Sequence, residues 1–164
     1  MFKFILVSLA ALFPLTACGS SPTARRYDDV MSGSERRMEI EGSGDIMKMC
    51  DIYANKAYFA YASDTLDDDD KMVVKKIGEC MLNGKLAGRS ILVTGYTDFT
   101  GPRAMNQELG LERSRAVADM LVSQGIPARR IFVRSRGERD AEYTTDTGTA
   151  YDRKIVMTLV VREK

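Results

Sequence analysis

Two charged residues, Asp98 and Arg113, have the types and positions that a binding site for a small zwitterionic molecule would require. At about 100° per residue, Arg113 falls inside the apolar stripe of a helix expected over residues 103–123, whereas Arg115 falls on the opposite face. A guanidinium keeps its proton, so an arginine among apolar neighbours needs an anionic or carbonyl partner. Two interpretations stay open. Arg113 forms an internal ion pair with Asp98, or Arg113 receives the carboxylate of a ligand while Asp98 receives its ammonium group.

The rest of the residue inventory argues against catalysis. The chain has no histidine, so the usual pairs of a nucleophile and a base cannot be assembled. A carboxylate pair such as Asp98 and Glu138 could in principle cleave a glycosidic bond, and the separation of the two groups would test that alternative. The contiguous carboxylates of residues 67–70 lack the spacing of a calcium loop and fit the start of a helix. We therefore expect a binding protein that is not an enzyme and has no metal site and no cofactor.

The first 17 residues have the features of a signal peptide. One cation, Lys3, precedes an apolar run over residues 4–15 that is too short to span a bilayer permanently. The segment ends in Leu15-Thr16-Ala17-Cys18, which resembles the lipobox of bacterial lipoproteins. This resemblance implies that Cys18 becomes the acylated first residue of the mature chain, carrying palmitate or similar acyl groups. The protein is then anchored to a membrane by lipid and does not span it.

Composition divides the chain after residue 17 into two parts. Residues 18–47 are mostly polar, small or charged without a sustained period, which predicts a flexible tether with one short extended piece at residues 38–40. Residues 48–164 are expected to form one folded domain. Basic and acidic residues are equal in number after residue 17, so nucleic acid is not expected as a partner.

Export also decides how the two remaining cysteines are interpreted. Cys50 and Cys80 would lie in the oxidising periplasm, where an even number of thiols favours pairing. We expect a disulfide between them. The alternative is a pair of buried free thiols, and two cysteines in a chain without histidine do not make a plausible metal site.

The hydrophobic pattern predicts an α+β fold. The apolar and turn-forming residues alternate so as to give the order β-α-β-α-β-β, which predicts a mixed sheet with the helices packed on one face. An Ile-Leu-Val run at residues 91–93 predicts a strand that is buried on both faces. The expected strands cover residues 57–61, 90–96, 131–133 and 154–161, and the expected helices cover residues 67–82 and 103–123.

An ordered series of motifs over residues 57–161 resembles the OmpA-like domain family. The series consists of Tyr58-Phe59, Ser63-Asp64-Thr65-Leu66, Gly95-Tyr96-Thr97-Asp98, Thr100-Gly101, Asn106, Leu109-Gly110, Arg113, Arg136-Gly137-Glu138 and Asp152-Arg153-Lys154-Ile155. A single Gly-x-Thr-Asp would be weak evidence, but the order and spacing of the whole series are specific.

The resemblance implies non-covalent binding of peptidoglycan through the diaminopimelate residue of its stem peptide. Asp98 matches the position that receives the ammonium group, and Arg113 matches the position that receives the carboxylate. The resemblance gives supporting roles in the pocket to Thr100, Asn106 and Arg153. The chain departs from the family pattern at four positions, where we expect altered affinity. These are Ala60, Ser135, Ala141 and Asp152.

The lipid anchor and the domain type together resemble lipoproteins of the Pal type. That likeness implies an alternative main role, an interaction module for a periplasmic protein partner. Gly19 after the lipidated cysteine follows the sorting pattern of outer-membrane lipoproteins. We therefore expect an outer-membrane location with the domain facing the periplasm, where it would tether the membrane to the cell wall.

Overall fold

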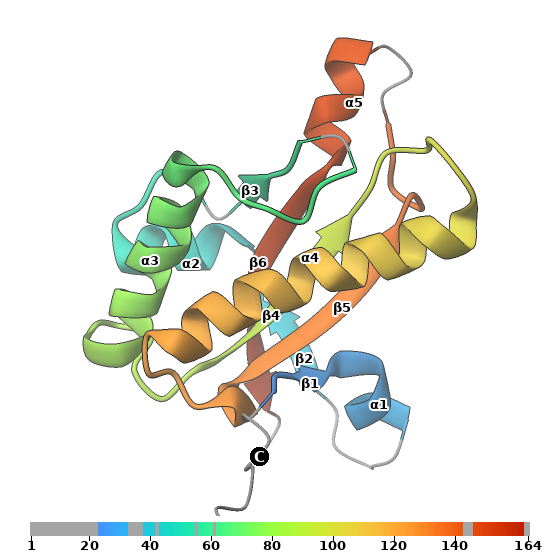
Figure 1. Cartoon of the computed structure of the whole chain (residues 1–164). Helices are drawn as coiled ribbons and strands as arrows, with labels where there is room; N and C mark the ends of the chain where they lie inside the picture. Colours follow the sequence, from blue (N-terminus) through green and yellow to red (C-terminus); the bar gives the residue numbers. More distant parts are fainter. Residues whose placement is uncertain are drawn as a thin grey trace, which may run out of the picture.

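A six-stranded mixed sheet forms the centre of the molecule (Figure 1). The computed structural model describes residues 23–32, 38–41, 43–54, 56–60, 62–142 and 146–162. The strands run in the order β1-β5-β4-β6-β2, and β3 also pairs with β6. Strands β4 and β5 are parallel, whereas β4 and β6 are antiparallel. The expected α+β fold with a mixed sheet is confirmed.

The central elements lie where the sequence predicts them. The strands are β1 (Arg25–Arg26), β2 (Met38–Glu41), β3 (Lys56–Tyr58), β4 (Ser90–Tyr96), β5 (Ile131–Gly137) and β6 (Lys154–Arg162). The helices are α1 (Tyr27–Ser32), α2 (Ser43–Cys50), α3 (Asp68–Asn83), α4 (Arg103–Ser123), the 3-10 turn η1 (Ala128–Arg130) and α5 (Asp146–Asp152). The bounds of β4 and α4 equal the expected ones. Strand β5 continues four residues beyond its expected end.

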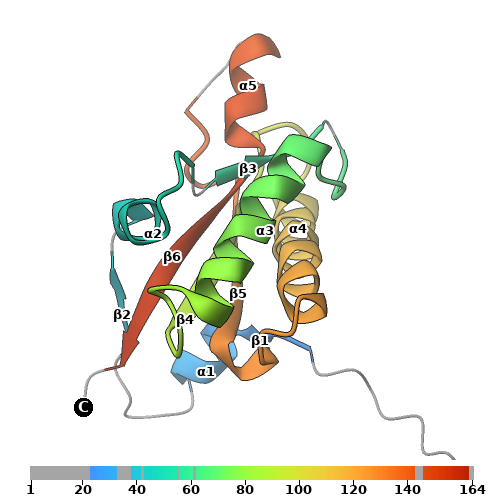
Figure 2. The ribbon, with the colours of Figure 1, turned by 90° about the vertical axis from the view of Figure 1, so that its left-hand side faces the viewer.

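Helices α3 and α4 pack on the same face of the sheet (Figure 2). Side chains alternate along a strand, so Ile91 and Val93 of β4 face these helices and Leu92 faces the other side. All three side chains are fully buried, which confirms the prediction from the Ile-Leu-Val run. On the second face, Leu92 packs with Tyr27 of α1, so a short helix covers part of the side that the sequence left open.

The flexible tether expected over residues 18–47 needs correction for its described part. Strand β1 pairs with β5, and β2, which contains the expected extended piece, pairs with β6. Ile46 of α2 is fully buried in the main core. This polar segment has only scattered apolar residues, but they are sufficient for it to form ordered elements, because the sheet provides two free edges for pairing and one uncovered face for packing. The expected signal peptide and the expected lipidation site, Cys18, lie outside the described residues. Among the described helices, none is long and apolar enough to cross a membrane.

The start of α3 differs in detail from the prediction. The helix was expected from residue 67, but Asp67 is its N-cap and not its first residue: the Asp67 side chain accepts a hydrogen bond from the backbone N–H of Asp70 at 2.8 Å. The carboxylates of residues 68–70 occupy the first turn, where the helix dipole favours negative charge. Residues 63–65 are part of the loop between β3 and α3, which contributes to the site described below.

A disulfide joins Cys50, the last residue of α2, to Cys80 near the end of α3. The expected pairing is confirmed, and it links α2 covalently to α3.

Removing this disulfide should lower the free energy of unfolding by about 3.6 kcal/mol, because it closes a loop of 30 residues. The double variant Cys50→Ser/Cys80→Ser, compared with wild type in urea unfolding, measures the difference. Wild type in reductant should behave like the variant. Equal stability of the oxidised wild type and the variant would contradict the prediction.

Candidate functional site

All five predicted binding residues line one pocket. It has a volume of about 470 Å³ and lies where β4 ends and α4 begins. The predicted residues that line it are Asp98, Thr100, Asn106, Arg113 and Arg153. The structure therefore brings together residues that are up to 55 positions apart in the sequence.

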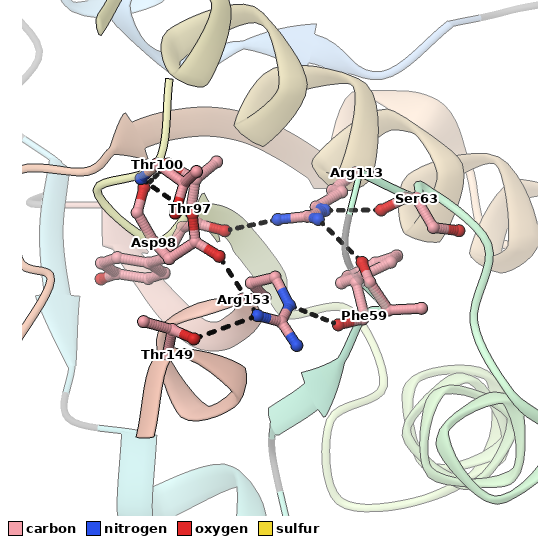
Figure 3. A network of polar contacts seen from close by, with 10 residues as sticks. Phe59, Ser63, Thr97, Asp98, Thr100, Arg113, Thr149 and Arg153 are labelled. Carbon is pink, nitrogen blue, oxygen red and sulfur yellow. Dashed lines mark hydrogen bonds and ion pairs between the residues drawn. The ribbon is translucent and has the colours of Figure 1, made fainter. Parts of the chain in front are cut away.

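Arg113 is fully buried, and backbone carbonyl oxygens surround its guanidinium group (Figure 3). The Nε–H donates to the carbonyl of Ser63 at 2.8 Å, and the two terminal nitrogens donate to Tyr96 at 3.1 Å and Ala60 at 3.3 Å. The group also lies 4.9 Å from the centre of the Phe59 ring, a cation–π contact. These contacts join α4 to the end of β4 and to the loop after β3.

The charge of Arg113 has no carboxylate in direct contact among the described residues. Burial lowers the pKa of its guanidinium to about 10, while the nearby charge of Asp98 acts in the opposite direction. The group is therefore still positive at neutral pH. Carbonyl oxygens of the described residues accept from three of the five N–H groups, which leaves two N–H groups without a hydrogen-bond partner in this part of the chain.

Asp98 is also buried, with only 4% of its surface exposed. Its Oδ1 accepts a hydrogen bond from the backbone N–H of Thr100 at 3.0 Å, and its Oδ2 lies 3.2 Å from a terminal nitrogen of Arg153. The ion pair of Asp98 is thus made with Arg153 and not with Arg113. Of the two interpretations of Arg113, the internal ion pair is not formed, although the two charges share the pocket.

Arg153 connects three parts of the structure around Asp98. Besides the ion pair, its Nε–H donates to the carbonyl of Phe59 at 3.2 Å, and a terminal nitrogen donates to the hydroxyl of Thr149 at 3.4 Å (Figure 3). Arg153 and Arg113 therefore both hold the backbone of the loop that begins at Phe59. Sequence reasoning placed Arg153 in the pocket but missed its pairing with Asp98.

Two glycines allow α4 to lie close enough to β4 for this geometry. A Cβ atom on Gly95 would collide with the backbone carbonyl of Gly110, and one on Gly110 would collide with the hydroxyl of Ser135. Arg113 lies three residues after Gly110, so the close contact between Gly95 and Gly110 places the Arg113 side chain beside Tyr96, the last residue of β4. This explains why the motif needs glycine at both positions.

The N-terminal end of α4 is held by side-chain contacts to the end of β5. The Asn106 amide donates to the Glu138 carboxylate, and the Gln107 amide donates to the carbonyl of Ser135 at 3.0 Å. Asn106 is buried, so its supporting role in the pocket includes fixing the helix. Glu138 is therefore engaged with Asn106 at the start of the helix.

Sequence reasoning missed several lining residues. These are Ala62, Thr97, Met105, Glu108, Leu109 and Glu112, together with the loop residues Gly101 and Pro102. Met105 is 67% exposed and lines the pocket at the start of α4. The buried face of α4 is centred near Gly110 and Val117. It includes polar residues such as Asn106 and Ser114, so the apolar residues alone do not mark this face. Within the described residues, no group of three or more potential metal ligands is present.

A comparison with models of protein families finds a match that covers the whole pocket. A model described as the OmpA family matches residues 58–154, which include every residue that lines the pocket. The chain belongs to the OmpA family. The matched range begins in β3 and ends at the start of β6, so the segment before β3 is outside it.

Curated relatives of this OmpA-family chain match part of its length. Outer membrane protein A of Serratia marcescens is 37% identical over 91 residues, which cover 51% of this chain and 25% of that protein. Outer membrane protein A of Serratia odorifera is 53% identical over 51 residues, which cover 31% of this chain and 21% of that protein. The chain thus spans about a quarter of the length of these relatives or less.

Solved structures share the fold of the OmpA-family domain. The peptidoglycan-associated lipoprotein of Burkholderia pseudomallei has a TM-score of 0.60 at 22% identity, over 65% of this chain and 90% of that chain. The C-terminal domain of MotB from Helicobacter pylori has a TM-score of 0.57 at 19% identity, over 68% and 85%. The OmpA-like domain of FopA1 from Francisella tularensis has a TM-score of 0.55 at 15% identity, over 88% and 94%.

Proposed function

We propose that this chain binds peptidoglycan non-covalently through the diaminopimelate residue of the stem peptide. The observation that carries the proposal is the pocket in which a fully buried guanidinium without a contacting carboxylate lies near a buried carboxylate. Diaminopimelate carries an ammonium and a carboxylate on the same carbon. Such a group fits a pocket that offers one charge of each sign at fixed positions.

Arg113 would receive the carboxylate of the ligand. Its guanidinium is already held by three carbonyl oxygens, so binding would not require the side chain to be ordered first. A carboxylate would also supply the negative charge that the carbonyl oxygens cannot. The main-chain contact at Ala60 does not depend on the side chain there, so this departure from the family pattern leaves the Arg113 network intact.

Asp98 would receive the ammonium group of the ligand while keeping its contact with Thr100. The ligand would share Asp98 with Arg153, which also has contacts to Phe59 and Thr149 and can stay in place. Asp152, another departure, accepts a hydrogen bond from the backbone of Glu142 and is buried beside the pocket-lining Arg153. Its role is therefore to position the segment before β6.

The family and the neighbouring structures support a binding role in the cell envelope. One structural neighbour is by name a peptidoglycan-associated lipoprotein, and the curated relatives are by name outer membrane proteins. We propose that acylated Cys18 anchors this chain in the outer membrane and that the domain faces the periplasm. The protein would hold the wall and catalyse no reaction on it.

Co-sedimentation with purified sacculi tests the proposed function. The full-length protein should sediment with sacculi that contain diaminopimelate, and soluble diaminopimelate-containing muropeptides should release it in a concentration-dependent manner. Release by muropeptides separates binding in the pocket from adhesion to the glycan mesh. Failure to sediment, or sedimentation that muropeptides do not reverse, would contradict the proposal.

A further inference from the structure

A second, basic pocket lies at the other end of the sheet from the proposed wall-binding site. It has a volume of about 610 Å³, and three arginines, Arg89, Arg129 and Arg130, line it together with the loop after α3. No acidic side chain is present among the described residues that line it. Arg129 is exposed and forms no ion pair within the described part of the chain.

Arg130 is fixed in this pocket by the loop that follows α3. Its Nε–H donates to the carbonyl of Arg89 at 2.7 Å, and one terminal nitrogen donates to Leu86 at 2.9 Å and Met81 at 3.1 Å. Partial burial and the neighbouring charge of Arg129 both lower the pKa of the Arg130 guanidinium. Two like charges are therefore held close together, and an anion that contacts both would relieve their repulsion.

The register of β1 shows that the chain enters the folded domain at this same end. Arg25 pairs with Phe132 in parallel orientation, so Thr23 lies at the level of Arg130. Strands β4 and β5 are also parallel, and Asp98 follows the far end of β4. The 21-residue helix α4 connects the two ends over a length of about 30 Å. In Figure 1, β1 lies at the bottom of the molecule and α5 lies at the top.

The distance from the domain to the proposed lipid anchor is correspondingly short. Only five positions separate Cys18 from Thr23, which allows a reach of about 18 Å at full extension. The tether expected from the sequence had 30 residues. With five, the end of the domain that carries Arg129 and Arg130 is held beside the membrane surface.

We propose that Arg89, Arg129 and Arg130 form a contact surface for the phosphate groups of an anionic phospholipid membrane. Exposed Lys85 adds to this surface, since it precedes Leu86, whose carbonyl accepts from Arg130. Arginine matches phosphate geometry, and the short link keeps the surface at high local concentration near the lipid. The wall-binding pocket at the opposite end then faces away from the membrane. The orientation rests on the proposed acylation of Cys18 and extends the proposed function.

Energy transfer from a single tryptophan tests this orientation, because the chain has none of its own. The probe is introduced in the full-length lipoprotein as Ala87→Trp at the basic end or as Phe99→Trp beside the wall-binding pocket, both at exposed positions. Each protein is bound to phosphatidylglycerol/phosphatidylethanolamine vesicles that contain a dansyl-labelled lipid. Transfer from the Ala87 position should exceed transfer from the Phe99 position by at least about twofold at low salt.

Charge variants then identify the surface responsible. Lys85→Gln/Arg129→Gln should reduce the difference between the two probes to the part that the short link alone imposes, as should high salt or replacement of the anionic lipid by phosphatidylcholine. Arg103→Gln/Arg139→Gln is the matched control, since it removes two charges from exposed arginines that do not line the basic pocket, and it should preserve the difference. The proposal is overturned if the protein does not float with anionic vesicles, if both probes transfer equally, or if Lys85→Gln/Arg129→Gln behaves like the control. Sacculus sedimentation of the same variants is unaffected in either case, so a failure here is distinct from a failure of wall binding.

Discussion

Replacing Asp98 with asparagine should lower the affinity for diaminopimelate-containing muropeptides by about 100-fold. The substitution keeps the shape of the side chain and an oxygen that can accept the Thr100 N–H, but it removes the charge that would bind the ligand's ammonium group. It also frees Arg153 from its ion pair, which places a second uncompensated positive charge in the pocket. Both changes act against an ammonium group. Calorimetric titration with a muropeptide measures the loss.

Asp140→Asn is the matched control for this substitution. Asp140 forms a bidentate pair with Arg136 at 2.9 and 2.8 Å, is half-exposed and does not line the pocket. Its replacement should leave muropeptide affinity within about twofold of wild type, because Asp140 does not line the pocket and a partly exposed ion pair contributes little to the stability of the fold. If Asp98→Asn binds as tightly as the control while circular dichroism shows a folded domain, Asp98 does not receive the ammonium group.

Replacing Arg113 with methionine should lower the free energy of unfolding by about 4 kcal/mol and abolish muropeptide binding. Methionine fills much of the same volume but leaves the carbonyls of Ala60, Ser63 and Tyr96 without their donor, at a cost of about 1–3 kcal/mol each where water cannot replace it. Relief of the buried charge offsets part of that cost. Urea denaturation of the purified variant measures the change.

Arg115→Met provides the control on the same helix. Arg115 lies two positions away on the solvent side and pairs with exposed Glu108 at 3.3 Å. Its replacement should change the free energy of unfolding by at most about 1 kcal/mol. Equal free energies of unfolding for the two variants would mean that the carbonyl contacts of Arg113 make no net contribution to stability. In that case the arginine is not preorganised by the fold in the way inferred above.

The central part of the fold was predictable because its patterns are local and strong. The Ile-Leu-Val run of β4 indicates a buried strand. Gly101-Pro102 before α4 and Gln124-Gly125 after it mark the ends of the long helix, although polar and apolar residues are mixed around its circumference. The expected cysteine pair also followed from chemistry, since export and an even number of thiols leave few alternatives. Strand β5 was underestimated because Arg134 and Arg136 interrupt its apolar pattern.

The N-terminal elements and α5 were not predictable in the same way. Residues 25–50 have few apolar side chains, and their structure depends on strand edges supplied by β5 and β6 more than 90 positions later. Helix α5 contains glycine and β-branched threonines, which have low helix propensity, so its local sequence does not predict a helix. Such long-range pairing leaves no period in the sequence.

The candidate site was predictable in composition but not in connectivity. A charged residue at an apolar helical position, such as Arg113, is a strong local signal, and the family motif supplied the other four residues. The partners of Arg113 were missed because they are backbone carbonyls, which every residue has and which leave no signal in the sequence. The partner of Asp98 was missed because the sequence alone cannot decide which of two arginines lies closer to it. Arg153, 55 positions from Asp98, is the clearest case.

Titration of the wild-type protein with two stem peptides that differ only at their third residue tests the central claim most directly. One peptide contains diaminopimelate, and the other contains lysine, which keeps the side-chain ammonium group but lacks the adjacent carboxylate. If Arg113 receives that carboxylate, the lysine peptide should bind at least about 10-fold more weakly, the equivalent of one lost charge-assisted hydrogen bond. Equal affinities for the two peptides would contradict the account.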